Sequence, residues 1–479
     1  MTGPQLAIVG AGPAGFYVAD ALCRKLPECH IALIDRLPTP FGLVRGGVAP
    51  DHQGTKNITR QFERTLTRGN VRFFGNVELG RDIGYEELKR AFDVVVLCTG
   101  APVDRRLDVP GESLPGVYGS GVFVSWYNGM PDQRELNPLL DGAAVAVIGN
   151  GNVAIDIVRL LCKSPAELAV SDICEHVLAR LSAARPREVY LIGRRGPLEA
   201  SFTAPELEEL GSLADAAPAL NPALLPAEVP ADWPEARRKD AEKNLGILRR
   251  FAAAPASSKP VQLRLLFNAA PSAIMGSERV AGLRLERTRL EGSRTLPTGV
   301  HFDIAVGTVV TAIGYRSAPL PGVPFDAERG MVCNHDGRVE PGVYCAGWCR
   351  RGAQGVIPAN RSDSLAVAEL ILADLAQAAP GNERPGAAQL DQLCAERAVG
   401  FNSEASRVPL SYWGTLLASR TGGTRTPWPP PTRRNAIRCT CSSSRIRRMT
   451  RCCFCIAFAK RIIIRSTSAL TTPPRCARR

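Results

Sequence analysis

The chain has 479 residues, 45% of them hydrophobic and 22% charged, which excludes wholesale disorder and exceeds one ordinary core. The net charge is +13, but residues 420–479 hold 15 bases and no acids, whereas residues 1–419 hold 44 bases and 46 acids. The basic excess therefore belongs to the C-terminal end, and the bulk of the chain does not indicate a nucleic-acid-binding protein.

No apolar run approaches the roughly 20 residues of a membrane-spanning helix, so we expect no membrane association. The N-terminus shows no basic segment followed by an apolar one and a cleavage site. We expect a cytoplasmic protein that acts as a monomer.

Short apolar runs alternate with helical patterns along the chain. Buried strands are predicted at residues 6–9, 30–35, 94–99, 144–148, 188–192, 309–313 and 343–346, and helices at 14–24, 153–161 and 364–376, with loop and helix over 214–258. This alternation predicts an α/β fold with parallel sheets and right-handed crossovers.

A glycine-rich turn, Gly10-Ala11-Gly12-Pro13-Ala14-Gly15, lies between the first strand and the first helix. Gly10 permits a tight turn, Gly12 lets a pyrophosphate approach the backbone, and Gly15 lets helix and strand pack closely. The helix N-terminus attracts phosphates, and Asp35, at the end of the next strand, can accept hydrogen bonds from ribose hydroxyls. Together they predict a dinucleotide site.

A second fingerprint, Gly149-Asn150-Gly151-Asn152-Val153-Ala154, is followed by a strand that ends in Gly193-Arg194-Arg195-Gly196. An NAD site would hold a carboxylate at that strand end, whereas paired arginines can grip a 2′-phosphate. The second site is therefore predicted to bind NADP. Two dinucleotide sites in one chain indicate electron transfer between a flavin and a nicotinamide, as in an NADPH-dependent flavoprotein oxidoreductase.

The run from Pro40 to His52 (Pro-Phe-Gly-Leu-Val-Arg-Gly-Gly-Val-Ala-Pro-Asp-His) resembles the ferredoxin–NADP reductase group typified by adrenodoxin reductase. The similarity continues through residues 147–156, 192–197, 202–207, 312–315, 346–348 and 355–357. It implies a ferredoxin–NADP(+) reductase that passes hydride from NADPH to FAD and then single electrons to a ferredoxin-type iron–sulfur protein. It also implies two Rossmann-like dinucleotide-binding domains, with the NADP domain inserted into a discontinuous FAD domain.

The resemblance implies the site residues as well. FAD would be contacted by Gly10, Gly12, Pro13, Ala14, Gly15, Asp35, Leu43, Leu79, Trp348, Gly355, Val356 and Ile357, and NADP by Arg105, Asn150, Gly151, Asn152, Val153, Arg194, Arg195, Glu206 and Gly355. His52 and Asp156 are candidates for a catalytic polar pair that couples proton movement or domain orientation. The alternative is a satisfied buried histidine and a helix carboxylate.

An acidic iron–sulfur partner would suit a basic patch. Its candidate residues are Arg237, Arg238, Lys239, Lys243, Arg249 and Arg250, although a solvated helix face explains these bases equally well.

The predicted domains are an FAD domain over residues 1–103 and 325–400 and an NADP domain over residues 104–324. Residues 401–479 are rich in Arg, Cys and Pro and show no consistent apolar face. We interpret them as disordered or as an out-of-frame ending rather than as a basic tail that binds an acidic partner. The cysteines at 439, 441, 452, 453 and 455 match no metal-site spacing well, so no metal is predicted.

Other functions remain open. One is an NADPH-dependent flavoprotein reductase with a quinone or small-molecule acceptor, and another is a redox protein that binds nucleic acid through the basic tail. A disulfide reductase would need a Cys-x-x-Cys pair beside the flavin, which residues 1–419 lack; Cys345 and Cys349 are expected to be core or surface thiols.

Overall fold

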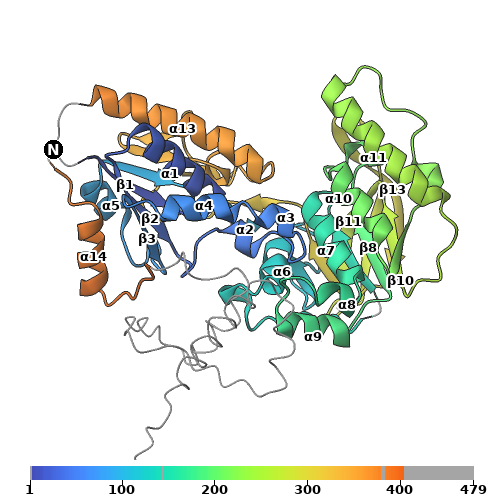
Figure 1. Ribbon diagram of the computed structural model, residues 1–479. Coiled ribbons are helices and arrows are strands. Elements are labelled where there is room, and N and C mark those ends of the chain that lie inside the picture. The colour runs from blue at the N-terminus through green and yellow to red at the C-terminus, as the bar shows by residue number, and fades with distance from the viewer. Residues whose placement is uncertain (1–2, 143, 379–382, 404–479) are drawn as a thin grey trace, which may run out of the picture. The chain divides into compact units, whose positions relative to one another are not determined.

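The computed structural model describes residues 3–142, 144–378 and 383–403. Its main feature is a pair of six-stranded sheets, each flanked by hydrophobic cores (Figure 1). None of the helices in this part of the chain is long and apolar enough to cross a membrane.

The first sheet has the strand order β18-β19-β4-β1-β2-β3. Its strands are β1 (Gln5–Val9), β2 (His30–Asp35), β3 (Val71–Gly75), β4 (Val94–Leu97), β18 (Arg338–Glu340) and β19 (Val343–Cys345). All neighbours pair in parallel except the edge strand β18, which is antiparallel to β19. The sheet thus combines strands from both ends of the described chain.

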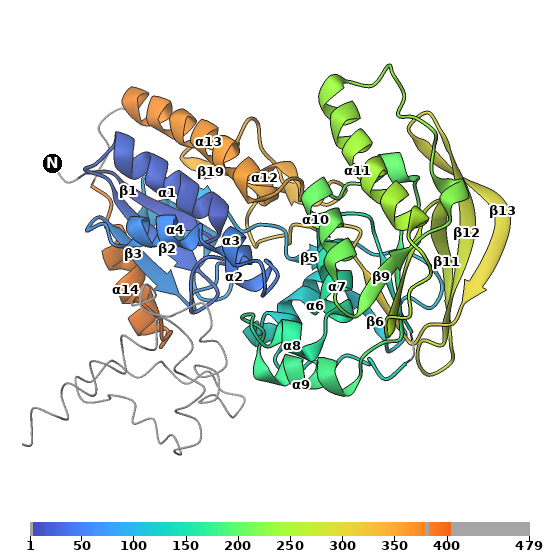
Figure 2. The same cartoon turned by 45° about the vertical axis from the view of Figure 1, so that its right-hand side comes forward.

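Both faces of this sheet are covered by helices. Leu6 and Ile8 of β1 lie in a core with α1 (Pro13–Lys25) and α13 (Ile357–Gln377), which pack side by side on one face (Figures 1 and 2). Ala7 and Val9 point the other way, toward α5 (Tyr85–Ala91) and α14 (Ala387–Glu396). Because successive strand residues face opposite sides, a fully apolar strand needs both layers.

The second sheet, with the order β6-β14-β7-β8-β10-β9, is parallel throughout. Its strands are β6 (Val117–Gly119), β7 (Ala144–Ile148), β8 (Glu188–Ile192), β9 (Ala216–Ala219), β10 (Val261–Leu266) and β14 (Thr308–Thr311). One face packs against α6 (Ser120–Tyr127), α7 (Asn152–Cys162) and α11 (Glu235–Ala253). The other packs against an antiparallel sheet of β11 (Ala269–Met275), β12 (Gly282–Glu291) and β13 (Arg294–Ile304).

Shorter elements complete the described chain. The helices are α2 (Leu43–Gly46), α3 (Gln53–Lys56), α4 (Thr59–Leu66), α8 (Pro165–Leu168), α9 (Glu175–Ala183), α10 (Ala204–Glu209) and α12 (Trp348–Arg351), with 3-10 turns at Pro131–Gln133, Pro197–Glu199, Leu210–Ser212 and Pro222–Leu224. Two antiparallel strand pairs join β5 (Val103–Asp104) to β15 (Tyr315–Arg316) and β16 (Phe325–Asp326) to β17 (Met331–Val332).

The expected α/β fold with parallel sheets is confirmed, and most predicted elements are present within a few residues of their expected bounds. The largest boundary error is in α13, which begins at Ile357 rather than at residue 364 because Pro358 in its first turn favours helix initiation. The three-stranded antiparallel sheet was not predicted. Its strands β12 and β13 are largely exposed and carry charged residues, so their apolar alternation is weak.

The predicted start of the tail at residue 401 is wrong by at least two residues. Gly75 and Asn402 exchange backbone hydrogen bonds of 3.0 Å, and Asn402 Nδ2 donates to Pro38 O at 2.8 Å. The Phe401 ring packs 5.1 Å from the Phe74 ring and lies under the Arg72 guanidinium. Phe401 and Asn402 therefore extend the first sheet's domain, and the rest of the predicted tail, residues 404–479, lies outside the described residues.

We expect Phe401→Ala to lower the free energy of unfolding by about 1–3 kcal/mol, because it removes a half-buried ring from the contact with Phe74 and Arg72. Urea denaturation followed by circular dichroism measures the change. Val300→Ala, at an exposed position of β13, is the control and should shift stability by less than about 0.5 kcal/mol. Equal stability of Phe401→Ala and wild type would show that Phe401 does not contribute to the folded domain of the first sheet.

Candidate active site

The first glycine turn has the geometry that a dinucleotide phosphate needs. Gly10 has φ +111°, and a Cβ there would lie 2.2 Å from Cys98 O; a Cβ at Gly15 would lie 2.0 Å from Gly10 O. Both positions are therefore restricted to glycine. At Gly12, the N-cap of α1, the nearest atom to an added Cβ is Gly42 Cα at 3.9 Å, so the backbone there is open to a ligand.

Asp35 supports this turn from the end of β2. Its Oδ2 accepts a hydrogen bond from Ala11 N at 2.7 Å, and its Oδ1 accepts one from Leu37 N at 2.9 Å. Burial raises the pKa of Asp35, while these two backbone bonds oppose the shift. A carboxylate has about four lone-pair sites, so capacity for ribose hydroxyls remains beside the bonds that hold the turn.

The C-terminal part of the described chain lies against the same helix terminus. A Cβ at Gly347 would approach Ala14 Cβ to 2.6 Å, and Ser364 Oγ donates to Ala14 O at 3.2 Å. Trp348 follows Gly347, stacks on Tyr315 with ring centroids 6.0 Å apart, and donates from Nε1 to Gln354 O. The segment that contains Trp348 is thus placed beside the turn at Ala14.

Two apolar side chains among the predicted FAD contacts are unusually open: Leu43 is 46% and Val356 57% exposed. They offer apolar surface of the kind that a flavin ring covers, and with the open turn at Gly12 the residues fit FAD. Leu79 differs, because it is buried in the core near Val77 and Ile83.

The second glycine turn repeats the geometry of the first. Gly149 has φ +141°, and a Cβ there would lie 2.1 Å from Ala312 O, whereas an added Cβ at Gly151, the N-cap of α7, would meet nothing within 4 Å. The side chain of Asn152 accepts from Thr203 N at 2.8 Å, and Asn150 O accepts from Ser201 N at 2.7 Å. These bonds hold the 201–203 loop beside the turn.

Arg194 and Arg195 follow β8, and both side chains are exposed. Thr288 Oγ1 donates to Arg194 O at 2.7 Å. This bond fixes the backbone of the turn and does not involve the Arg194 guanidinium. The open turn at Gly151 and two exposed guanidiniums fit a nucleotide with a 2′-phosphate. Arg105 lies elsewhere in the sequence but contacts β15, donating from Nε to Tyr315 O at 3.3 Å.

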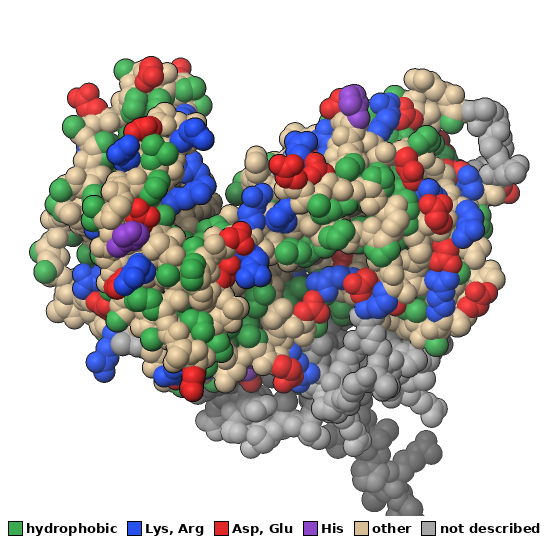
Figure 3. Space-filling model, turned by 180° about the vertical axis from the view of Figure 1, so that it is seen from behind, with side chains coloured by type: hydrophobic (Ala, Val, Ile, Leu, Met, Phe, Trp, Pro, Cys, Tyr) green, Lys and Arg blue, Asp and Glu red, His purple; other side chains and the backbone are tan. Residues whose placement is uncertain are grey.

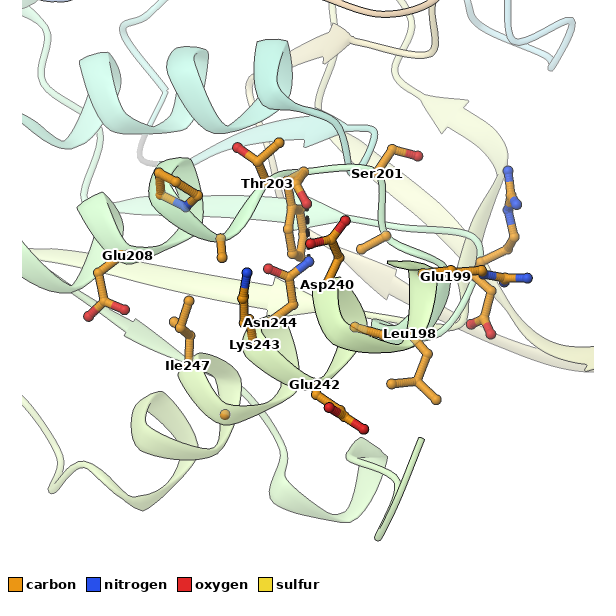
Figure 4. Close-up of a pocket in the computed structure, with 18 of the residues that line it drawn as sticks. Leu198, Glu199, Ser201, Thr203, Glu208, Asp240, Glu242, Lys243, Asn244 and Ile247 are labelled. Carbon is orange, nitrogen blue, oxygen red and sulfur yellow. Dashed lines mark hydrogen bonds between the residues drawn. The ribbon is translucent and has the colours of Figure 1, made fainter. Parts of the chain in front are cut away.

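A groove of about 1030 Å³ begins at Arg195 and runs between the 198–205 loop and α11. Figure 4 shows Asp240, Lys243 and Asn244 on the helix and Ser201 and Thr203 on the facing loop. Its charged lining residues balance, four bases against four acids: Arg195, Arg237, Lys243 and Arg250, and Glu199, Glu208, Asp240 and Glu242. The groove is therefore not a basic surface.

The structure brings His52 and Asp156 together, as expected of a polar pair: Nδ1 lies 3.6 Å from Asp156 Oδ1. His52 Nε2 lies 3.1 Å from Glu209 Oε2 and 3.8 Å from Glu206 Oε2. The Glu209 hydrogen bond raises the pKa of His52, against the effect of burial, and lowers the pKa of Glu209. Burial raises the pKa values of Asp156 and Glu206.

Sequence reasoning missed four members of this cluster: Asp51, Arg159, Lys163 and Glu209. The sequence does contain a hint of Arg159, because it is the single charged residue in the apolar helical run from Ile157 to Leu161. A charged side chain on a buried helix face needs partners of opposite charge, so carboxylates could have been sought near it. For Glu209 there is no such hint, since acids are common at helix ends.

Three buried cysteines lie close to the first turn. Cys98 directly follows β4, Cys345 ends β19, and Cys349 Sγ donates to Leu97 O at 3.1 Å. Burial raises the pKa of all three thiols. Cys345 and Cys349 are thus core thiols, and all nine cysteines in the described ranges are free.

Comparisons with known proteins agree with this geometry. A family model described as pyridine nucleotide-disulphide oxidoreductase matches residues 4–191. Human mitochondrial NADPH:adrenodoxin oxidoreductase is 41% identical over 416 residues, which cover 83% of this chain and 84% of the human protein. NADPH-ferredoxin reductase FprA of Mycobacterium tuberculosis is 38% identical over 392 residues, covering 79% of this chain and 85% of FprA.

The structure of Mycobacterium tuberculosis FprA in complex with NADPH has a TM-score of 0.79 to this chain at 36% identity, covering 82% of this chain and 91% of FprA. Similarity of this extent spans both sheets and both glycine turns. This chain therefore belongs to the flavoprotein family that includes NADPH:adrenodoxin oxidoreductase and NADPH-ferredoxin reductase FprA.

Proposed function

We propose that this chain is an NADPH-dependent ferredoxin reductase, which passes hydride from NADPH to FAD and then single electrons to a ferredoxin-type iron–sulfur protein. One observation carries the proposal: two strand–turn–helix sites in one chain, one closed by a buried carboxylate at Asp35 and the other by exposed guanidiniums at Arg194 and Arg195. FAD supplies the conversion between two-electron and one-electron transfer.

The residues proposed to hold FAD divide by what they offer. The α1 N-terminus and its turn (Gly10, Gly12, Pro13, Ala14, Gly15) would take the pyrophosphate, Asp35 the ribose, and Leu43, Leu79, Trp348, Gly355, Val356 and Ile357 the ring system. The exposure of Leu43 and Val356 supports this assignment, and the burial of Leu79 makes it the weakest member.

For NADP, the proposed pyrophosphate contacts are Asn150, Gly151, Asn152 and Val153, with Arg194 and Arg195 on the 2′-phosphate and Arg105, Glu206 and Gly355 as further contacts. Glu206 points toward His52, so its contribution would be made beside the histidine cluster. His52 and Asp156 are proposed as a proton-holding pair, supported by their 3.6 Å contact.

The proposed domains are an FAD domain over residues 1–103 and from 325 to at least 402, with an NADP domain over 104–324 between them; the strand composition of the two sheets supports this division. We propose a monomer, because both turns and the histidine cluster come from one chain. The free thiols support a reducing compartment, for which we propose the cytoplasm.

We also propose that the iron–sulfur partner presents an acidic surface. Among the α11 bases, Arg238, Lys239 and Arg250 pair with Glu242, Glu235 and Glu208, and Arg249 donates to Pro226 O. Arg237, stacked on Trp233, and Lys243 have no carboxylate partner among the described residues, so they are the bases left to meet an acid. On the face in Figure 3, basic and acidic side chains are interspersed, which favours a few specific pairs over a broad basic field.

The first test is an anaerobic titration of the purified protein with NADPH, and with NADH in parallel, followed by the visible flavin spectrum. We expect bleaching at a much lower concentration of NADPH than of NADH. A yellow protein that neither nucleotide bleaches would refute hydride transfer to FAD in this chain.

Replacing both Arg194 and Arg195 by Gln should raise the Kd for NADPH by about 100-fold, because two charge-assisted hydrogen bonds to the 2′-phosphate are lost. The Kd for NADH should change by less than about threefold, since NADH lacks that phosphate. Arg264→Gln, which breaks a surface pair with Glu188 on the same sheet, is the matched control. Equal losses for both nucleotides would contradict the assignment.

Replacing Arg237 and Lys243 by Gln should raise the KM for an acidic ferredoxin by about 3–10-fold at low salt, and the effect should fade near 0.5 M NaCl as screening grows. NADPH-dependent ferricyanide reduction, which needs no protein partner, should not change. A KM effect that persists at high salt would argue against electrostatic recognition.

A further inference from the structure

Residues 49–56, which carry His52, are anchored on elements that cover the second sheet. Ala49 is buried in the hydrophobic core of α6 and α7. Pro50 O accepts a hydrogen bond from Asp172 N at 3.0 Å, and Lys56 Nζ donates to Asp172 Oδ2 at 3.4 Å. This segment, whose neighbours in sequence belong to the first sheet, is therefore held in place by the other half of the molecule.

Arg159 of α7 makes the central polar contact of this anchorage, and its side chain is only 1% exposed. Nη1 donates to Asp51 Oδ2, in a contact shared with Lys163 Nζ, and Nη2 donates to Asp156 Oδ1 at 2.7 Å. Nε lies 3.0 Å from Glu209 Oε2 without an aligned hydrogen bond, so that third contact is electrostatic. One guanidinium thus faces carboxylates from three segments.

Two of these carboxylates are the ones that flank His52. Asp156 lies beside Nδ1 and Glu209 beside Nε2. In this cluster the four carboxyl groups of Asp51, Asp156, Glu206 and Glu209 face two cationic side chains, Arg159 and Lys163, beside the imidazole. Arg159 therefore limits the repulsion among acids that must stay close together to hold the imidazole.

We propose that Arg159 is a positioning residue for reduction of the flavin by NADPH: its guanidinium orients Asp51, Asp156 and Glu209 and thereby keeps His52 seated between α7 and α10. This rests on the proposed function. Within the described chain, Arg159 makes no hydrogen bond or ion pair with either glycine turn, so it acts through the residues that it holds.

The fork geometry is what the role requires. Asp51 and Asp156 are met by different Nη atoms of one planar group, and a lysine ammonium presents a single point charge that does not reproduce two divergent donors. Arg159→Lys therefore retains the charge and loses the geometry, whereas Arg159→Met loses both.

The charge of Arg159 and its geometry have separate effects on the pH–rate profile. The groups that face His52 are Asp156 and Arg159 from α7 and Glu206 and Glu209 from α10, and Arg159 is the one that lowers the pKa of His52. Arg159→Met should therefore move the His52-dependent limb of the pH–rate profile to higher pH, while Arg159→Lys should leave it near the wild-type position. His52→Gln identifies that limb by abolishing it.

The experiment is stopped-flow reduction of the FAD-loaded protein by NADPH. We expect the limiting rate in Arg159→Lys to fall by about 10–100-fold, the size of effect that small misplacements produce. The Kd for NADPH should change by less than about threefold. Arg185→Lys is the matched control, because Arg185 also bridges a carboxylate, Asp215, and a carbonyl, Cys162 O, but lies outside the histidine cluster.

An FAD-loaded Arg159→Lys that reacts at the wild-type rate would overturn the inference, as would an unshifted pH profile in Arg159→Met. If neither variant folds, Asp51→Asn decides: it removes one carboxylate of the same contact and should slow reduction by a similar factor, and a wild-type rate would refute the proposal. A wild-type protein that NADPH does not reduce would instead refute the proposed function.

Discussion

A guanidinium removed from water must be met by carboxylates at suitable angles, and the arrangement around His52 depends on this requirement at Arg159. The ion pairs involve a loop next to the first sheet, a helix of the second sheet and the end of α10. Burial opposes ionisation of Asp51, but Arg159 and Lys163 outweigh it and lower its pKa to about 2. The contact between Asp51 and Arg159 is therefore ionic throughout the physiological range.

The two proposed nucleotide sites share one backbone geometry at the glycine turn but differ in the side chains at the end of the next strand. Gly10 and Gly149 both adopt positive φ beneath a carbonyl that excludes any side chain, and Gly12 and Gly151 both leave the helix N-terminus open. What differs is the end of the following strand: a buried carboxylate at Asp35, the last residue of β2, in one case, and exposed arginines directly after β8 in the other. In the proposed function, the shared turn would bind phosphate and the strand end would select the nucleotide.

The sequence was sufficient to predict the two glycine turns, because their glycines are required by local steric constraints. The sequence also makes His52 and Asp156 candidates for a polar pair, with a satisfied buried histidine as the alternative, and the two side chains lie 3.6 Å apart. It was insufficient for Asp51, Arg159 and Glu209, whose relation exists only after segments more than 40 residues apart have packed. The antiparallel sheet was not predicted for a different reason. The sequence of β13 is that of an exposed, proline-containing segment, and it forms a strand because it pairs with β12.

The buried thiols near the first turn bear on where electrons can leave. Exchange with a disulfide requires a thiolate, and burial holds Cys98, Cys345 and Cys349 in the protonated, unreactive form. The family model that matches the first part of the chain takes its name from disulphide chemistry, yet the cysteines around this turn act as apolar filling. At this turn, burial alone thus withholds from Cys98, Cys345 and Cys349 the thiolate form that disulfide exchange needs.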